Sequence, residues 1–167
     1  TGPLVEYFVS RAYQRDVNFH SIFGSGGRLA HSFAKLAKEV WAASNKTAIS
    51  PTAFKKDIGR INEQFVGYEQ HDAQEFLVFL LDGLSEDLNL ILKKPYIESP
   101  DSAGRPDSEL ADVWWNDHLK RDCSVIQALF TGQFKSVVSC QCGHESARFE
   151  PFTTLSLPIP SETRQKQ

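Results

Sequence analysis

The pattern of hydrophobic and polar positions changes near residue 130 of this 167-residue chain. Up to that point apolar residues recur at spacings of three and four, which is typical of amphipathic helices. One helix is predicted from about residue 28 to residue 44, with a buried face formed by Leu29, Phe33, Leu36, Ala37, Val40 and Trp41. A short second helix is predicted to begin with Ser50 as its cap and Pro51 at its first position.

Two further helices are predicted on either side of a loop. The first begins near residue 73, and one of its sides enters a core through Phe76, Leu77, Phe79, Leu80, Leu81, Leu84 and Leu88. Residues 93–107 hold three prolines and a glycine, which indicates an exposed loop. A helix over about residues 108–121 follows, with Leu110, Val113 and Trp114 facing inward, and residues 125–130 form a short apolar turn.

The end of the chain favours β-structure. Residues 133–140 are rich in β-branched side chains and alternate in part, so a strand is predicted there. A tight cysteine-containing turn, a returning strand over about residues 145–149 and an extended segment over residues 153–158 complete the pattern. Because an isolated hairpin is only marginally stable, we expect further strands to pair with it.

Composition is that of part of a globular intracellular protein, with 41% hydrophobic residues and a formal net charge of -3. Three cysteines are an odd number and too few for a disulfide scaffold, which favours a reducing compartment, the cytoplasm or the nucleus. No apolar run is long enough for a membrane span or a secretory signal. The chain contains no methionine, so we expect that residue 1 is not a natural translation start.

Residues 67–76, Gly-Tyr-Glu-Gln-His-Asp-Ala-Gln-Glu-Phe, place several polar groups at the start of a core-forming helix. Asp72 is suited to cap the first turn and leaves a carboxylate at the positive end of the helix dipole. Such a group would meet a cationic or amide-bearing partner. The alternative is an ordinary, well-capped surface helix, because Asp, Gln and Glu are common in first turns.

Residues 67–76, together with residues 80–89, resemble the Gln-box region of the ubiquitin-specific proteases, the papain-like cysteine deubiquitinases. Residues 3–8 are similar to the helix that follows the catalytic cysteine segment of that family. Residues 95–98, 105–107, 114–118, 132–136 and 149–160 resemble a subgroup whose catalytic domain is split by a long insertion. The resemblance implies an α+β, papain-like fold, with a helical thumb portion at residues 1–128 and a β-hairpin fingers and palm portion at residues 129–167. Together these portions would form one incomplete catalytic domain.

The same resemblance implies an activity that this chain cannot carry out alone. The family's Asn-Thr-Cys nucleophile segment is expected before residue 1, and its His and Asp/Asn segments after residue 167. No catalytic residue is therefore assigned, and the C-terminal half of the same catalytic domain is an expected partner. The implied reaction is thiol-dependent hydrolysis of the isopeptide bond after the last glycine of ubiquitin. The alternative is a catalytically inactive ubiquitin-binding or scaffold module.

Ubiquitin is the partner that the resemblance implies, through its arginine-bearing tail that ends in two glycines. Asp72 and Glu150 would accept hydrogen bonds from arginine, and Gln70 and Gln74 would bind the tail backbone. The remaining implied contacts are His71, Ala73 and Glu75 at the helix start, and Phe149 as part of the wall of a narrow channel. No nucleic-acid partner is expected, because Lys and Arg are not clustered around residues 133–150.

The Cys140-Gln141-Cys142-Gly143-His144 turn is the candidate metal site. In the resembling family a Cys-x-x-Cys turn supplies half of a structural four-cysteine zinc site. Here the spacing is one residue shorter, and His144 is a candidate substitute ligand. Both interpretations stay open: half of a zinc site formed by Cys140 and Cys142, and a metal-free hairpin. No cofactor is expected for catalysis.

Overall fold

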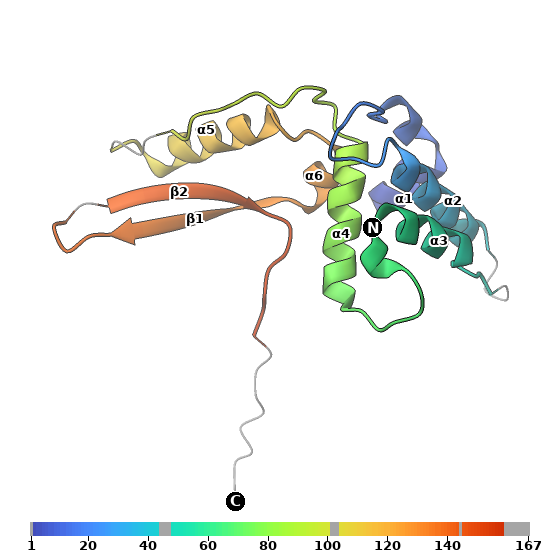
Figure 1. The fold of residues 1–167 in the computed structure, drawn as a ribbon. Coiled ribbons are helices and arrows are strands. Elements are labelled where there is room, and N and C mark those ends of the chain that lie inside the picture. The colour runs from blue at the N-terminus through green and yellow to red at the C-terminus, as the bar shows by residue number, and fades with distance from the viewer. Residues whose placement is uncertain (1, 44–47, 101–103, 144, 159–167) are drawn as a thin grey trace, which may run out of the picture.

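The computed structural model describes residues 2–43, 48–100, 104–143 and 145–158. A long central helix, α4 (Ala73–Asp87), separates a helical group from a layer that contains the β-hairpin (Figure 1). The helical group comprises α1 (Gly2–Val9), α2 (Arg28–Ala42), α3 (Thr52–Ile61) and the 3₁₀ turns Ala12–Arg15 and Glu63–Phe65. The other layer comprises α5 (Asp107–Leu119), α6 (Val125–Phe130), β1 (Gly132–Ser139) and β2 (Glu145–Phe152).

The core lies where α1, α2, α3 and α6 meet α4. Its most deeply buried members are Phe8, Leu29, Ile58, Leu84, Leu88 and Ile126, each at most 2% exposed. Gly83 permits the closest approach between α2 and α4, since a Cβ there would lie 2.5 Å from Cδ2 of Leu29. The predicted apolar face of α4 is confirmed at the buried Leu81, Leu84 and Leu88, whereas Leu77, also predicted to enter the core, is 48% exposed.

Local predictions failed at two further places in the helical part. Val40 and Trp41 are 53% and 64% exposed, because the last turn of α2 extends past the helices that cover its earlier turns. The helix α3 begins at Thr52 rather than at Pro51, and the Ser50 hydroxyl contacts the Thr52 hydroxyl at 2.6 Å instead of capping a backbone N–H. The predicted end of α2 at residue 44 lies outside the described residues.

The prediction of an apolar turn at residues 125–130 was also wrong, because this segment is the helix α6. The Ser124 hydroxyl caps it by accepting a hydrogen bond from the backbone N–H of Gln127 at 3.1 Å. Six residues are too few for helical periodicity to be recognised in the sequence. The cap, followed by the apolar Val125 and Ile126, was the signal that could have identified it.

The hairpin is antiparallel, with Lys135 opposite Phe149 and Phe134 opposite Glu150. The strand β2 ends at Phe152, three residues later than predicted. One face packs against α5: Lys135 forms an ion pair with Asp107, and the Gln133 side chain donates to the carbonyl of Ala111 at 3.2 Å. Residues 153–158 leave the hairpin without strand pairing among the described residues. The division of the chain at residues 128 and 129 stays a prediction.

Phe134 and Phe152 stack on the face of the hairpin opposite α5. Their ring centroids are 3.8 Å apart and their planes differ by 19°. The Phe152 ring also covers Gly132, where an added Cβ would lie 2.7 Å from the ring. These contacts pack the base of the hairpin, which begins two residues after the end of α6.

Candidate functional site

The start of α4 is capped by Asp72, as the sequence predicts. One carboxylate oxygen of Asp72, Oδ1, accepts the backbone N–H groups of Gln74 at 2.6 Å and of Glu75 at 3.3 Å. The other oxygen makes no hydrogen bond among the described residues, and the Asp72 side chain is exposed. Asp72 therefore stabilises the first turn and still presents an acceptor to solvent.

An aromatic cluster holds this helix start in place. The Phe65 ring is 5% exposed and packs against Phe76 and Phe79, with centroid distances of 5.3 and 5.0 Å. His71 contacts the same ring edge-on at 5.2 Å. Gly67, at φ 81°, turns the intervening loop back toward α4. The packed aromatic side chains therefore hold the polar groups of the helix start in place.

All six predicted site residues of this segment, from Gln70 to Glu75, are exposed. Three of them, Asp72, Gln74 and Glu75, line one surface hollow together with Val78. Glu69 is exposed on the loop just before this segment and adds negative charge. These exposed acidic and amide groups are referred to below as the acidic helix start (residues 69–75).

The two predicted site residues of β2 lie elsewhere and on opposite faces of the hairpin. Phe149 is 7% exposed and shares the α5-covered face with Lys135. Glu150 is exposed on the face that carries Phe134 and Phe152. Contact between Phe149 and a ligand stays a prediction, and its burial favours a supporting role beneath Glu150.

A cavity of about 470 Å³ joins the end of β2 to the middle of α4. Its walls include Leu81, Asp82, Pro151 and Thr153. Asp82 lies nine residues beyond Ala73, which corresponds to roughly 14 Å along the helix axis. The structure therefore does not bring Glu150 into contact with Asp72, but it places the two at separate levels along α4.

Charged residues that the sequence did not single out line this cavity. The ammonium of Lys94 contacts Glu86 at 2.5 Å and Asp122 at 2.6 Å. Burial opposes the charge on Lys94, but the hydrogen bonds to Asp122 and Glu86 outweigh it, so the pKa of Lys94 is raised. Burial also raises the pKa of Asp82, with a smaller contribution from Glu86. Local sequence gave no signal for this cluster, because its members come from three separate segments.

Two side-chain nitrogens beside the same cavity, one of a histidine and one of a glutamine, have no hydrogen-bond partner within the described chain. Nε2 of His118 and Nε2 of Gln127 are buried without a hydrogen bond among the described residues. Burial lowers the pKa of His118, an effect that Asp122 opposes and that Lys94 and Arg121 reinforce. His118 is therefore mainly neutral near pH 7.

Cys140 and Cys142 are exposed at the tip of the hairpin. The backbone N–H of Cys142 donates to the sulfur of Cys140 at 3.4 Å, which orients that sulfur within the turn. His144, the third candidate ligand, lies outside the described residues. Among residues 2–43, 48–100, 104–143 and 145–158, no group of three or more His, Cys, Asp or Glu side chains is placed to bind one ion. The described residues therefore fit two ligands of a tetrahedral zinc site and no more.

Cys123 is half-buried between α5 and α6. Its backbone N–H donates to Oδ1 of the buried Asn89 at 3.1 Å, and its carbonyl accepts the N–H of Leu90 at 2.9 Å. These contacts give Cys123 a structural place, because they tie the loop between α5 and α6 to the segment that follows α4. Within the part of the chain that the structure describes, no helix is both long and apolar enough to cross a lipid bilayer.

Comparison with known proteins adds to this geometry. A family model described as ubiquitin carboxyl-terminal hydrolase matches residues 1–158. The chain is 48% identical over 161 residues to ubiquitin carboxyl-terminal hydrolase 15 of Homo sapiens, which covers 96% of this chain and 16% of that relative. It is 49% identical over 162 residues to putative ubiquitin carboxyl-terminal hydrolase 11 of Arabidopsis thaliana, covering 96% of this chain and 18% of that relative. The chain thus spans less than a fifth of the length of these curated relatives.

Proposed function

The chain belongs to the ubiquitin carboxyl-terminal hydrolase family, and we propose that it supplies ubiquitin-tail recognition to a thiol-dependent deubiquitinase. The reaction would be hydrolysis of the isopeptide bond after the last glycine of ubiquitin. The observation that carries this proposal is the acidic helix start, where Asp72 caps α4 with one oxygen and offers the other to solvent. A guanidinium group binds such a carboxylate through a charge-assisted hydrogen bond.

The spacing of the two acidic sites supports an extended ligand. Asp72 lies at the start of α4, and the end of β2 with Glu150 lies beside the middle of that helix, roughly 14 Å further along its axis. About four residues of extended chain cover that rise along the helix axis. A ubiquitin tail with arginines near each end of such a stretch would reach Asp72 and Glu150 together, while Gln70 and Gln74 bind its backbone.

The chemical step is assigned to groups outside this chain. Acyl transfer by a thiol needs a thiolate and a base within hydrogen-bonding reach. Cys123 is half-buried within a structural network, and Cys140 and Cys142 lie at the far tip of the hairpin. The nucleophile and the histidine base would come from the remainder of the catalytic domain, and we place the complete enzyme in the cytoplasm or the nucleus.

A structural zinc ion is the further element of this proposal. Cys140 and Cys142 would supply two of its ligands, and another pair would come from the C-terminal half of the domain. When bound, the ion would pin the tip of the hairpin, because zinc sites of this kind contribute to folding rather than to the reaction.

The test uses the full-length protein and a ubiquitin probe that carries an electrophile at its C-terminus. We expect covalent labelling at a cysteine other than Cys123, Cys140 and Cys142. Replacement of the tail arginines of the probe by glutamine should slow labelling, whereas the same replacement elsewhere on ubiquitin should not. Labelling at Cys123 would refute the assignment of the nucleophile. Tight ubiquitin binding without any labelling would favour the alternative, an inactive ubiquitin-binding or scaffold module.

A further inference from the structure

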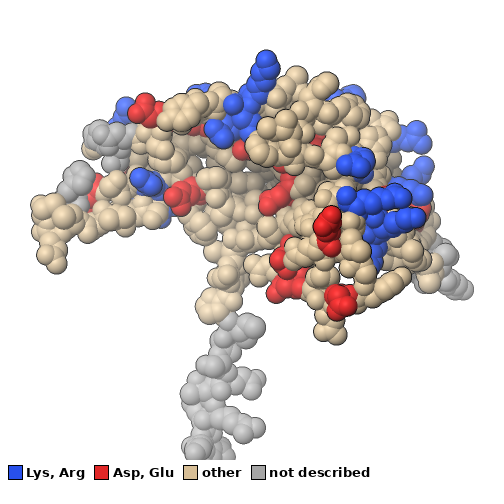
Figure 2. Space-filling model, viewed as in Figure 1, with Lys and Arg blue, Asp and Glu red and all other residues tan. Residues whose placement is uncertain are grey.

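The charges of the chain are strongly segregated. Residues 28–61 contain seven of the 18 Lys and Arg residues but only two of the 21 Asp and Glu residues. Six of these seven cations lie in described parts of the structure, on α2 and α3. In Figure 2 the blue side chains gather on the right, where Figure 1 places these two helices. The chain as a whole is negative, so this basic surface is a local feature of one helix pair.

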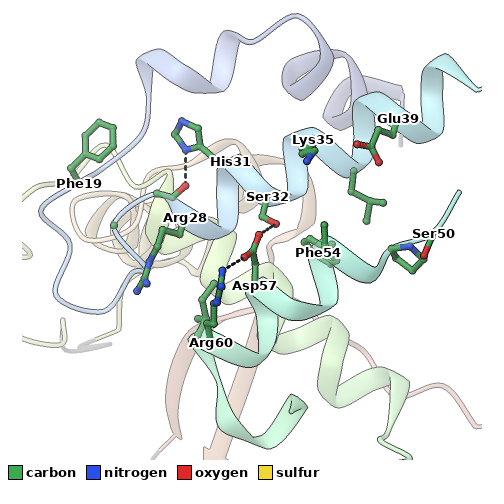
Figure 3. Close-up of a pocket in the computed structure, with 16 residues that line it drawn as sticks. Phe19, Arg28, His31, Ser32, Lys35, Glu39, Ser50, Phe54, Asp57 and Arg60 are labelled. Carbon is green, nitrogen blue, oxygen red and sulfur yellow. Dashed lines mark hydrogen bonds and ion pairs between the residues drawn. The ribbon is translucent and has the colours of Figure 1, made fainter. Parts of the chain in front are cut away.

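A cavity of about 420 Å³ opens on this surface between α2 and α3 (Figure 3). Leu36, Phe54 and Ile61 contribute apolar walls, and Phe19, 64% exposed, stands at its edge. Arg28, Lys35, Arg60 and His31 also line it. An apolar hollow edged by cations is suited to a ligand that is both hydrophobic and negatively charged.

One of the two acids that line the cavity is already paired within the protein itself. Asp57 accepts a hydrogen bond from the Ser32 hydroxyl at 2.8 Å and pairs with Arg60 at 3.0 Å. Figure 3 shows Asp57 held between these two side chains. Its charge therefore does not cancel the remaining cations that face the opening.

Two of those cations are available to a ligand. Lys35 is exposed and makes no ion pair or hydrogen bond among the described residues. Arg28 uses only Nε, which donates to the carbonyl of Ser25 at 3.0 Å, and its terminal nitrogens make no ion pair within the described chain. Glu39 lies at the other end of the cavity, beyond Lys35 in Figure 3. The cavity thus has a positive end and an acidic end, which fixes the direction of a charged ligand.

We propose that the cavity between α2 and α3 is a docking site for an acidic peptide segment of a partner protein. A leucine or phenylalanine of that segment would enter against Leu36 and Phe54, and flanking carboxylates would meet Arg28 and Lys35. Nucleic acid fits less well, because the walls are largely apolar and the chain as a whole is negative. The site lies on α2 and α3, away from the acidic helix start on α4, so both can be occupied together.

The test measures fluorescence anisotropy of a labelled synthetic peptide of alternating glutamate and leucine with the full-length protein. We expect saturable binding that weakens as salt is raised. The double variant Arg28→Glu and Lys35→Glu should weaken binding at least roughly tenfold. Both side chains are exposed, so these changes should leave the thermal unfolding midpoint nearly unchanged. The matched control, Lys93→Glu and Arg105→Glu, makes the same net change of charge on an exposed loop outside the cavity and should bind like the parent.

Three results would overturn the proposal. The first is equal binding of a peptide in which serine replaces glutamate, and the second is equal weakening by the control variant. The third is tighter binding of a labelled single-stranded oligonucleotide, which would identify the surface as a nucleic-acid site. Labelling by the ubiquitin probe is measured in parallel, and it should be unaffected by Arg28→Glu and Lys35→Glu. Failure of the peptide site is therefore distinguishable from failure of the proposed deubiquitinase function.

Discussion

The fully buried carboxylate of Asp87 binds Ser25, 62 residues away in sequence, through both the backbone N–H and the hydroxyl of that serine, each at 2.6 Å. Asp87 also accepts the N–H of Ala30 at 3.2 Å, and the Ser25 hydroxyl accepts the N–H of Leu29 at 2.8 Å. One acidic side chain at the end of α4 thus satisfies donors at the start of α2. This contact joins the two helices that carry the acidic helix start and the basic cavity.

Replacing Asp87 by Asn should therefore destabilise the protein. The amide retains the shape but turns an acceptor into a donor that faces other donors, at a cost of about 2 to 4 kcal/mol. The measurement is the free energy of unfolding in urea. Asp112→Asn, an exposed acid on α5, serves as the control and should change the stability by less than about 0.5 kcal/mol. A small effect for Asp87→Asn would contradict the role assigned to these hydrogen bonds.

Gly83→Ala should also destabilise the protein, although alanine is normally favoured over glycine inside a helix by about 1 kcal/mol. The new Cβ would lie 2.5 Å from Cδ2 of the fully buried Leu29, so overpacking, which costs about 1 to 3 kcal/mol, should outweigh the helical preference. Thermal denaturation of the single variants and of Gly83→Ala combined with Leu29→Val tests this cause. The double variant should lose less stability than the two single losses combined. Additive losses would show that the clash is not responsible.

Two substitutions of Asp72 separate its role as a helix cap from its proposed role in ligand binding. Asp72→Asn retains a side-chain oxygen for the cap but removes the charge, whereas Asp72→Ala removes both. We expect Asp72→Asn to unfold like the parent and Asp72→Ala to lose about 1 kcal/mol of stability. In the full-length protein both variants should reduce kcat/KM for ubiquitin substrates. The loss for Asp72→Ala should be equivalent to about 1 to 3 kcal/mol. Unchanged kcat/KM in a folded Asp72→Asn protein would exclude the carboxylate as an arginine acceptor.

His118 should make the stability depend on pH. Burial lowers its pKa in the folded protein, so the unfolded chain binds a proton that the folded chain excludes. Above pH 6.5, the ordinary pKa of histidine, His118 does not lower the stability. As the pH falls from 6.5 toward the folded-state pKa, the unfolded chain takes up the proton and the free energy of unfolding decreases. The decrease in unfolding free energy from about pH 7.5 to about pH 5.5 should be smaller in His118→Gln. His20→Gln, at an exposed histidine, should keep the parent's pH profile, and an unchanged profile in His118→Gln would exclude this group.

Zinc content tests the proposed metal site at the hairpin tip independently of deubiquitinase activity. The full-length protein should bind about one equivalent of zinc. Cys140→Ser and Cys142→Ser should each reduce this content and lower the thermal unfolding midpoint, whereas Cys123→Ser should retain the metal. Less than about half an equivalent in the parent protein would favour the metal-free hairpin.

The sequence alone predicted the features that depend on neighbouring residues. The helical period of α2 and α4, the cap at Asp72 and the hairpin around the cysteine turn all follow from residues within a few positions of each other. The errors made from the sequence alone have the same origin, because neighbouring residues do not show what packs against them. The periodicity of α2 continues through Val40 and Trp41, but only the position of the neighbouring helices decides where burial ends.

Tertiary structure decided which side chains meet across the fold. Phe149 and Glu150 are adjacent in sequence, yet α5 covers one and leaves the other exposed. Asp87 accepts its hydrogen bonds only because the start of α2 packs against the end of α4. The basic cavity exists only because α2 and α3 pack side by side and direct Arg28, Lys35 and Arg60 to one opening. Local preference fixes the elements and their polar ends, whereas burial, charge pairing and cavities arise from faces that no short stretch of sequence specifies.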